Sequence, residues 1–260
     1  MVLRRRPRRR DHQQSGTLVT ARPNLLAGED LPAEPRQKRS LEKRARLMTA
    51  SLACFGEKGY ESTSIDEIAR RANLAVGGFY QHFRSKRQLL LALMDELLEH
   101  LSRLDLRPAP GLGIQASLRQ LLSRAFSTDL HYLGAYRAWQ EAVLSDSGLA
   151  AKQAQIQIWT TARVTAVFRI LAKLPGARRE VDITGLARVM DHFFWSLLAR
   201  AAYLPKRELT QWIDAATHLI YHAMFIDAQP APAYTPSRPS SRTSRGAVPR
   251  SPSRGRRPQR

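Results

Sequence analysis

The chain has 260 residues, of which 43% are apolar and 7% aromatic, and it carries 42 Lys and Arg against 22 Asp and Glu, for a formal net charge of +20. This length allows one large or two small domains with a buried core, and the positive charge indicates a polyanionic partner, either nucleic acid or an anionic membrane surface. The single cysteine, Cys54, excludes an intramolecular disulfide framework, and no apolar run is long enough to span a membrane. We therefore expect a cytoplasmic protein with no membrane partner.

The positive charge is concentrated at the two ends of the chain. Residues 1–39 hold ten Lys and Arg and four Asp and Glu, a net charge of +6, and residues 228–260 hold eight Arg and no acidic residue. Both segments contain too little apolar surface to offset the entropy of ordering. The prediction is a disordered basic arm over 1–39 and a disordered Arg/Ser/Pro-rich tail over 228–260. Arg39 precedes the first helix and would contact DNA from the arm.

Between residues 40 and 227, apolar residues recur with the 3.6-residue period of helices, and this pattern predicts an all-α fold. A first helix would end at Gly59, because glycine readily adopts the left-handed conformation. Ser64 and Glu67 have the spacing of a capping box and would begin a short second helix, and Asn73 marks a turn. In chain order, the helices predicted here run over about 41–58, 65–72, 75–83 and 85–104.

Two short helices joined by a tight turn, with a longer helix on each side, are typical of a helix-turn-helix DNA reader. The helix over 75–83 would enter the major groove. Gly77 and Gly78 would each cost an ordinary helix about 1 kcal/mol relative to alanine. At this position the missing side chains would let the backbone approach base edges closely, while Tyr80 and His82 would project toward the flanking phosphates.

One stretch, from Arg44 to Leu98, resembles the N-terminal DNA-binding domain of the TetR/AcrR family of bacterial transcriptional regulators. The matching residues are FGEKGYESTSIDEIARRANLAVGGFYQHFRSK and the LLLALMDELL that follows. The resemblance implies an N-terminal three-helix helix-turn-helix DNA-binding domain over 40–86. It also implies a C-terminal helical-bundle domain over 87–227 that binds an effector and forms a homodimer.

By position, the resemblance implies two sets of contacts with double-stranded DNA. The residues expected at phosphates are Thr63, Ser64, Tyr80, His82 and Lys86. The residues expected at base edges are Val76, Gly77, Gly78 and Gln81. A palindromic operator would be read by two copies of the chain.

The remaining helices are predicted over 114–131, 134–144, 148–174, 182–204 and 206–227. The last two carry more apolar residues than one core face requires. In the final helix Leu219 belongs to the main apolar stripe, whereas Ile213 and Ile220 broaden the apolar arc, as Val189 does in the helix before it. We interpret the pair as a helical hairpin that packs on its own domain and on a second copy.

Large side chains on the middle helices are candidates for binding an unidentified, lipophilic small-molecule effector. The candidate ligand-binding residues are Phe126, Tyr136, Trp139, Glu141, Trp159 and His192. Glu141 and His192 are singled out because a buried polar group needs a partner and could mark the polar end of a pocket. The alternative for each residue is an ordinary core or dimer contact.

Other groupings of polar residues have simpler explanations. Asp214, His218 and His222 share a helical face, but a polar stripe explains them without a metal. Asp191 and His192 are adjacent and point apart on a helix, and no nucleophile motif accompanies them. We expect no metal, no cofactor and no enzyme activity, and we place Cys54 in the core.

These patterns together predict a homodimeric DNA-binding transcriptional regulator. We interpret it as a repressor that a lipophilic effector releases from a palindromic operator. Two alternatives remain open at this point. One is an arm-driven, non-specific nucleic-acid-binding protein, and the other is a helical enzyme or carrier with a vestigial reading head.

Overall fold

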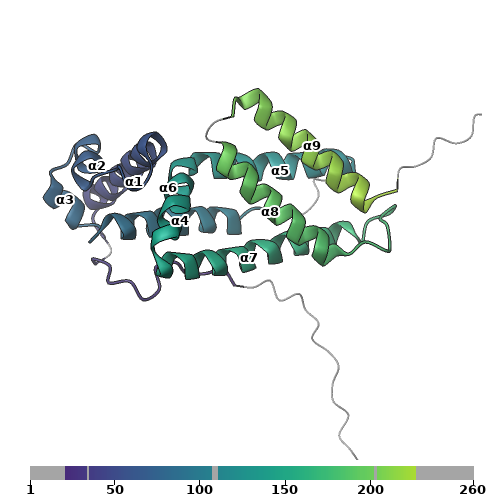
Figure 1. Cartoon of the computed structure of the whole chain (residues 1–260), viewed down its shortest axis with the longest axis horizontal. Helices are drawn as coiled ribbons and strands as arrows, with labels where there is room; N and C mark the ends of the chain where they lie inside the picture. Colours follow the sequence, from purple (N-terminus) through teal and green to yellow (C-terminus); the bar gives the residue numbers. More distant parts are fainter. Residues whose placement is uncertain (1–20, 34, 107–110, 202–203, 227–260) are drawn as a thin grey trace, which may run out of the picture. The chain divides into compact units, whose positions relative to one another are not determined.

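The computed structural model describes residues 21–33, 35–106, 111–201 and 204–226, and these residues are helical apart from turns and one isolated bridge between Ala177 and Phe225 (Figure 1). In chain order the helices are α1 (Lys38–Lys58), α2 (Ile65–Arg71), α3 (Val76–Tyr80), α4 (Lys86–Ser102), α5 (Ile114–His131), α6 (Leu133–Ser145), α7 (Ser147–Leu171), α8 (Ile183–Ala201) and α9 (Lys206–Met224). The all-α fold predicted from the apolar period is confirmed. Within the described ranges, no helix has the length and hydropathy needed to cross a membrane.

The three-helix head (α1 to α3) forms as its capping residues predict. The Ser64 hydroxyl accepts a hydrogen bond from the Glu67 backbone N–H at 3.2 Å, which begins α2. The Glu67 carboxylate accepts from Lys58 Nζ at 2.5 Å instead of returning to Ser64, so only half of the capping box is present. Asn73 has a φ of +54° in the predicted turn, and Phe79 of α3 is fully buried against α1 and α2.

The recognition helix is shorter than predicted. α3 spans only Val76–Tyr80, and Gln81 is its C-cap, whereas the sequence pattern extends to Phe83. The chain leaves the helix here because Ser85 must become extended, with φ −157° and ψ 162°, to cap α4 through the backbone N–H of Gln88. Phe83 is still buried. Its place in the apolar pattern therefore reflects packing in the core and does not mean that the helix extends to it.

Two glycines allow the head to pack closely on the rest of the chain. Gly59 ends α1 with φ +81° and ψ −175°, a region open essentially to glycine alone and different from the predicted left-handed helical one. Gly134 lies where α6 crosses α1, and an added Cβ there would collide with the backbone carbonyl of Leu52. Glycine at 134 therefore permits backbone contact between the head and α6.

The structure corrects the prediction of a disordered arm for residues 21–39. Residues 21–33 and 35–37, here called the N-terminal segment, lie on the folded body, and α1 begins at Lys38. Leu25 is fully buried in the core, and Arg22 pairs with Asp95 of α4 at 2.7 Å. The segment was predicted to be disordered because it contains prolines, many charges and few apolar residues. Burial of Leu25 and the ion pair of Arg22 nevertheless fix the segment to α4. The predictions for residues 1–20 and 228–260 lie outside the described residues.

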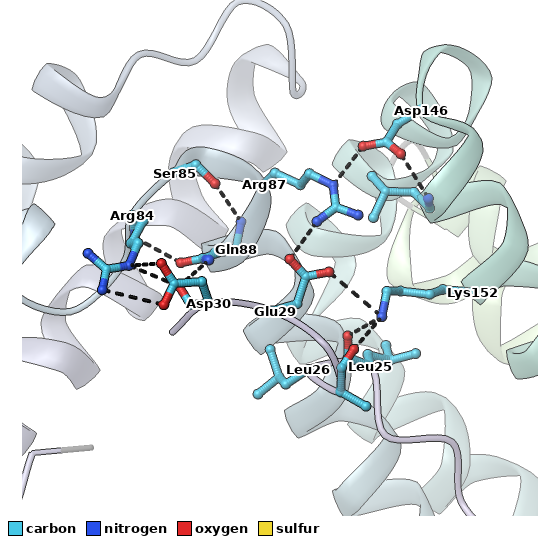
Figure 2. A network of polar contacts seen from close by, with 12 residues as sticks. Leu25, Leu26, Glu29, Asp30, Arg84, Ser85, Arg87, Gln88, Asp146 and Lys152 are labelled. Atoms are coloured by element: carbon cyan, nitrogen blue, oxygen red, sulfur yellow. Dashed lines mark hydrogen bonds and ion pairs between the residues drawn. The ribbon is translucent and has the colours of Figure 1, made fainter. Parts of the chain in front are cut away.

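Acidic residues of the N-terminal segment contact both α4 and α7 (Figure 2). The Glu29 carboxylate lies 2.7 Å from Arg87 Nη1 and 3.8 Å from Lys152 Nζ. Arg87 also pairs with Asp146, the N-cap of α7, at 2.7 Å. The Asp30 backbone carbonyl accepts from the Gln88 side chain at 2.8 Å. These contacts link the start of α4 to the start of α7.

The described helices bury two apolar clusters. The first joins the head, α4, α6 and the first half of α7 with Leu25, and the second joins α5, the remainder of α7, α8 and α9. Because α4 contributes to the first cluster and also packs on α5, it connects the three-helix head to the C-terminal helices.

The last two helices do not form the predicted hairpin. α9 packs mainly along α5, and α8 packs mainly along α7. The inward face of α9 combines Ile213 and Ile220 of the predicted surplus arc with Leu209 and Ala216, whereas Leu219 of the predicted main stripe is 57% exposed. A broad apolar arc contains two overlapping 3.6-residue stripes, and packing against α5 decides which one is buried.

Candidate nucleic-acid interface and ligand cavity

The exposed surface of α3 is formed by the residues predicted to face bases. Val76, Gly77 and Gln81 are exposed, and Gly78 is half-buried. A Cβ added at Gly77 would meet no atom within 4 Å, so the space beside it is open. The structure thus places Val76, Gly77 and Gly78 in the first turn of a short helix that Phe79 anchors in the core, and Gln81 at its C-cap.

Two of the predicted phosphate contacts, and Arg39 from the predicted arm, are accessible. The Tyr80 side chain is 50% exposed and stands edge-on to Phe79, with ring centroids 5.5 Å apart. Ser64 is exposed at the N-terminus of α2, and Arg39 is exposed in the first turn of α1. All three side chains are therefore open to solvent, as a contact to a sugar-phosphate backbone requires.

Thr63 and His82 do not fit the phosphate role that their positions implied. Thr63 is buried, and its hydroxyl donates to the Gly59 carbonyl at 2.6 Å. His82 is 6% exposed, and its two ring nitrogens have no hydrogen-bond partner among the described residues. Burial, together with Arg44 and Lys43, lowers the pKa of His82. We conclude that both side chains support the fold of the head.

Lys86 also departs from its predicted role. Its Nζ donates to the carbonyl oxygens of Tyr60 at 2.6 Å and Thr63 at 2.9 Å, and it lies 4.3 Å from the centroid of the Tyr60 ring. Burial lowers the pKa of this ammonium group. Lys86 therefore holds the loop between α1 and α2 against α4. Position in a motif could not reveal this role, because three-dimensional contacts to backbone carbonyls have no signature in the sequence.

A second polar contact joins the head to the C-terminal helices. The Glu141 carboxylate of α6 accepts from the backbone N–H of Tyr60 at 2.6 Å, beside Gly59. Glu141, predicted to mark the polar end of a ligand pocket, thus caps a turn of the head. The expectation of a buried partner for this carboxylate was sound, but the partner is a backbone amide.

One apolar cavity of about 170 Å³ lies among α4, α5, α7 and α8. Two of the predicted ligand-binding residues, Tyr136 and Trp159, line it. The Tyr136 hydroxyl donates to the backbone carbonyl of Trp195 at 3.1 Å, and their rings stack with centroids 5.3 Å apart. Trp195 also lines the cavity.

The other predicted ligand-binding residues lie elsewhere. Phe126 is buried behind the cavity wall and contacts Phe194, with ring centroids 5.7 Å apart. Trp139 donates to the Gln153 side chain at 2.6 Å in the first cluster, and His192 is exposed. Large aromatic residues on amphipathic helices are common in cores, and the sequence carries no signal that separates cavity lining from core.

Two charged side chains, Asp191 and Arg163, line the cavity, and neither was among the predicted ligand-binding residues. Asp191 is 3% exposed and accepts a hydrogen bond from the Thr161 hydroxyl at 2.7 Å, and burial raises its pKa. Arg163 donates from Nη2 to the Leu101 carbonyl at 2.7 Å, and burial lowers its pKa. Asp191 and Arg163 could have been identified from the sequence as ionisable residues at helix positions where the pattern expects apolar ones.

The polar residues that share one face of α9 contact other side chains. Asp214 pairs with Arg119 of α5 at 2.5 Å, and the rings of His218 and His222 are 4.0 Å apart. Within the described ranges, no group of three or more His, Cys, Asp and Glu is placed to hold a metal ion. Cys54 is fully buried, and burial raises the pKa of its thiol.

Comparison with known proteins gives a consistent result. Residues 47–93 match the family model of bacterial regulatory proteins of the tetR family. The HTH-type transcriptional activator FasR of Mycolicibacterium smegmatis is 28% identical over 137 residues, covering 52% of this chain and 61% of FasR. The HTH-type transcriptional repressor KstR of Rhodococcus jostii is 33% identical over 97 residues, covering 37% of this chain and 44% of KstR. The chain thus spans less than two thirds of the length of these two relatives.

Solved structures share the fold over most of the chain. A SmeT–triclosan complex has a TM-score of 0.55 at 21% identity, covering 72% of this chain and 93% of SmeT. A gamma-butyrolactone receptor described as ArpA-like has a TM-score of 0.54 at 19% identity, covering 72% of this chain and 90% of the receptor. The fold shared with these structures is a three-helix head on an all-helical body. Residues 47–93 thus match the DNA-binding domain of the tetR family, and the chain is similar to regulators of that family.

Proposed function

We propose that the chain is a homodimeric transcriptional repressor that binds a palindromic operator through two copies of α3. A lipophilic small molecule in the cavity would release it. The observation that carries this proposal is the open, side-chain-free surface at Gly77, on a helix that Phe79 anchors rigidly in the head. Such a surface lets backbone atoms reach base edges in the major groove.

Release by a ligand requires a connection between the cavity and the head, and α4 supplies a continuous one. Its first residue, Lys86, holds the α1–α2 loop, and Met94 and Leu98 further along α4 line the cavity. A ligand that displaces the middle of α4 would therefore move its first turn and the head attached to it. Interfaces between packed helices respond to such shifts as two-state elements.

Dimer formation is supported by apolar side chains left on the outer surface of the last two helices. Val189 of α8 is 65% exposed, and Leu219 of α9 is 57% exposed. A second copy that packs on these faces would bury them and give two recognition helices related by a two-fold axis. We propose repression because the relative KstR is named as a repressor. The relative FasR is named as an activator, and activation is therefore the alternative that the experiment must distinguish.

The proposal is tested by footprinting the purified full-length protein on the DNA upstream of its own coding sequence. Gly77→Leu should abolish the footprint while preserving thermal unfolding, because the new side chain enters the groove and not the core. Gly113→Leu is the matched control, since a Cβ there also meets no atom within 4 Å but lies before α5. A normal footprint for Gly77→Leu would refute α3 as the reader, and a reporter gene that loses expression when the regulator is deleted would refute repression.

A further inference from the structure

Arg163 is a cation in the wall of an otherwise apolar cavity. Its Nη2 donates to the Leu101 carbonyl at 2.7 Å, and its guanidinium carbon lies 5.0 Å from the centroid of the Trp159 ring. Among the residues that the structure describes, no Asp or Glu forms an ion pair with it. A guanidinium has five N–H donors, so one carbonyl and one aromatic face leave most of its hydrogen-bonding capacity unused.

The position is costly for the apoprotein. Partial burial of a charge is unfavourable unless a counter-charge or hydrogen bonds compensate, and desolvation is the effect that lowers the pKa of Arg163. The other arginine contacts near α4 differ in this respect, because Arg87 pairs with both Glu29 and Asp146. An uncompensated arginine in a cavity wall is what a site for an anionic ligand requires.

Asp191, the acidic residue of the cavity, is a weaker candidate for binding a cationic ligand than Arg163 is for binding an anionic one. Asp191 already accepts a hydrogen bond from the Thr161 hydroxyl at 2.7 Å, and Thr160, which also lines the cavity, accepts from Trp195 Nε1 at 3.4 Å. Asp191 therefore already has a hydrogen-bond donor from the neighbouring helix α7. Burial moves its pKa upward, toward the neutral acid.

We propose that the effector is a lipophilic anion, whose carboxylate pairs with Arg163 and whose apolar body fills the cavity beside Leu122, Val164 and Leu198. This inference rests on the proposed effector role of the cavity and adds the chemical class of the ligand. A dry cavity of about 150 Å³ holds benzene. The 170 Å³ available here therefore suits a medium-chain or single-ring carboxylic acid.

The test compares three ligands of equal chain length on the full-length wild-type protein at pH 7.5. Octanoate, 1-octanol and octylammonium are titrated while the fluorescence of the tryptophans is followed, since Trp159 and Trp195 line the cavity. Octanoate should bind about tenfold more tightly than 1-octanol, the ratio expected from one charge-assisted hydrogen-bonded pair. Octylammonium should bind more weakly than either.

Substitutions then assign the preference to Arg163. Arg163→Gln should weaken octanoate about tenfold and leave 1-octanol within about twofold, while Arg163→Lys should keep part of the preference because it keeps the charge. Arg169→Gln is the matched control, because it removes an exposed positive charge from the same helix. Arg163→Lys and the wild-type ligand series decide the matter if Arg163→Gln fails to fold.

Each outcome has a defined meaning. Equal affinities for octanoate and 1-octanol, or an equal loss of both in Arg163→Gln, would overturn the anion assignment while leaving the cavity as an effector site. Tighter binding of octylammonium would make Asp191 the charge partner and would also overturn it. Failure of all three ligands to bind would refute the effector cavity itself. None of these measurements involves DNA, so they are independent of the operator proposal.

Discussion

Glu29 of the N-terminal segment and Arg87 of α4 form an ion pair at 2.7 Å, and the same guanidinium pairs with Asp146 at the start of α7. Three parts of the chain far apart in the sequence therefore meet at one arginine (Figure 2). The Glu29 and Arg87 side chains are partly buried, so the pair is less screened by solvent than a surface pair.

Glu29→Gln should lower the free energy of unfolding by about 1 to 2 kcal/mol, because a charge-assisted contact is lost and Lys152 loses its carboxylate neighbour. Asp30→Asn is the control, since the Asp30–Arg84 pair is largely exposed and should contribute less than about 0.5 kcal/mol. Urea denaturation measures both. An effect of Glu29→Gln as small as that expected for Asp30→Asn would mean that the N-terminal segment does not stabilise the body through Glu29.

Gly134→Ala should separate α6 from α1, because the new Cβ would collide with the Leu52 carbonyl. Overpacking of this kind costs about 1 to 3 kcal/mol. Gly56→Ala, on the other side of the same crossing, is the control: its Cβ would lie 3.6 Å from the Gly134 Cα, an ordinary contact, and replacing a helical glycine gains up to about 1 kcal/mol. Urea denaturation of the two variants should show opposite signs, and a neutral Gly134→Ala would contradict the crossing.

The variants Lys86→Met and Arg39→Gln test whether Lys86 has a structural role and Arg39 a phosphate-binding role. Lys86→Met should destabilise the protein, because two backbone carbonyls lose their donor, yet leave the slope of log affinity against log salt unchanged. Arg39→Gln should leave stability unchanged and reduce that slope by about 1. Salt titrations of operator binding decide between them. A reduced slope for Lys86→Met would restore the phosphate role.

Leu219→Glu should yield a folded monomer, because Leu219 is exposed in the single chain and a carboxylate there would be buried only in a dimer. Operator affinity should fall as well, since each half-site would be bound alone. Leu144→Glu, which alters an exposed leucine at the end of α6, should sediment as a dimer. A dimeric Leu219→Glu variant would exclude this face of α9 as the interface.

Asp191 should make stability depend on pH in a predictable direction. Burial raises its pKa, so the folded chain holds the proton more tightly than the unfolded chain does. Its contribution is fully present below the unfolded value of about 3.9 and is lost as the pH rises through the folded value. The free energy of unfolding of the wild type should therefore fall relative to that of Asp191→Asn as the pH rises from about 4. A constant difference across denaturation series at several pH values would contradict this.

The local features of the head could be predicted from the sequence. The Ser64 cap, the positive φ of Asn73, the Ser85 cap and the burial of Phe79 each depend on a few neighbouring residues. Hydrogen bonds across three residues and a period of 3.6 are short-range effects, which a linear pattern records. The family resemblance rests on the same stretch.

The roles of individual polar side chains depended on the tertiary structure. Thr63, Lys86 and Glu141 were each assigned to a ligand or to DNA, but all three satisfy backbone groups in or beside the loop between α1 and α2. Arg163 received no assignment, although it lines the cavity. Whether a polar group meets solvent, a ligand or a carbonyl depends on which segments fold around it.

By itself, the sequence determined the helical class of this protein, the position of the three helices of the head and the residues that cap them. Only the tertiary structure decided that residues 21–33 pack on the body, that α9 pairs with α5, and that Tyr136 and Trp159 share a cavity while Trp139 does not. The physical reason is the range of the interactions. Capping and amphipathic period act within a few residues, whereas burial of Leu25 or the choice between two apolar stripes depends on contacts between segments far apart in the chain.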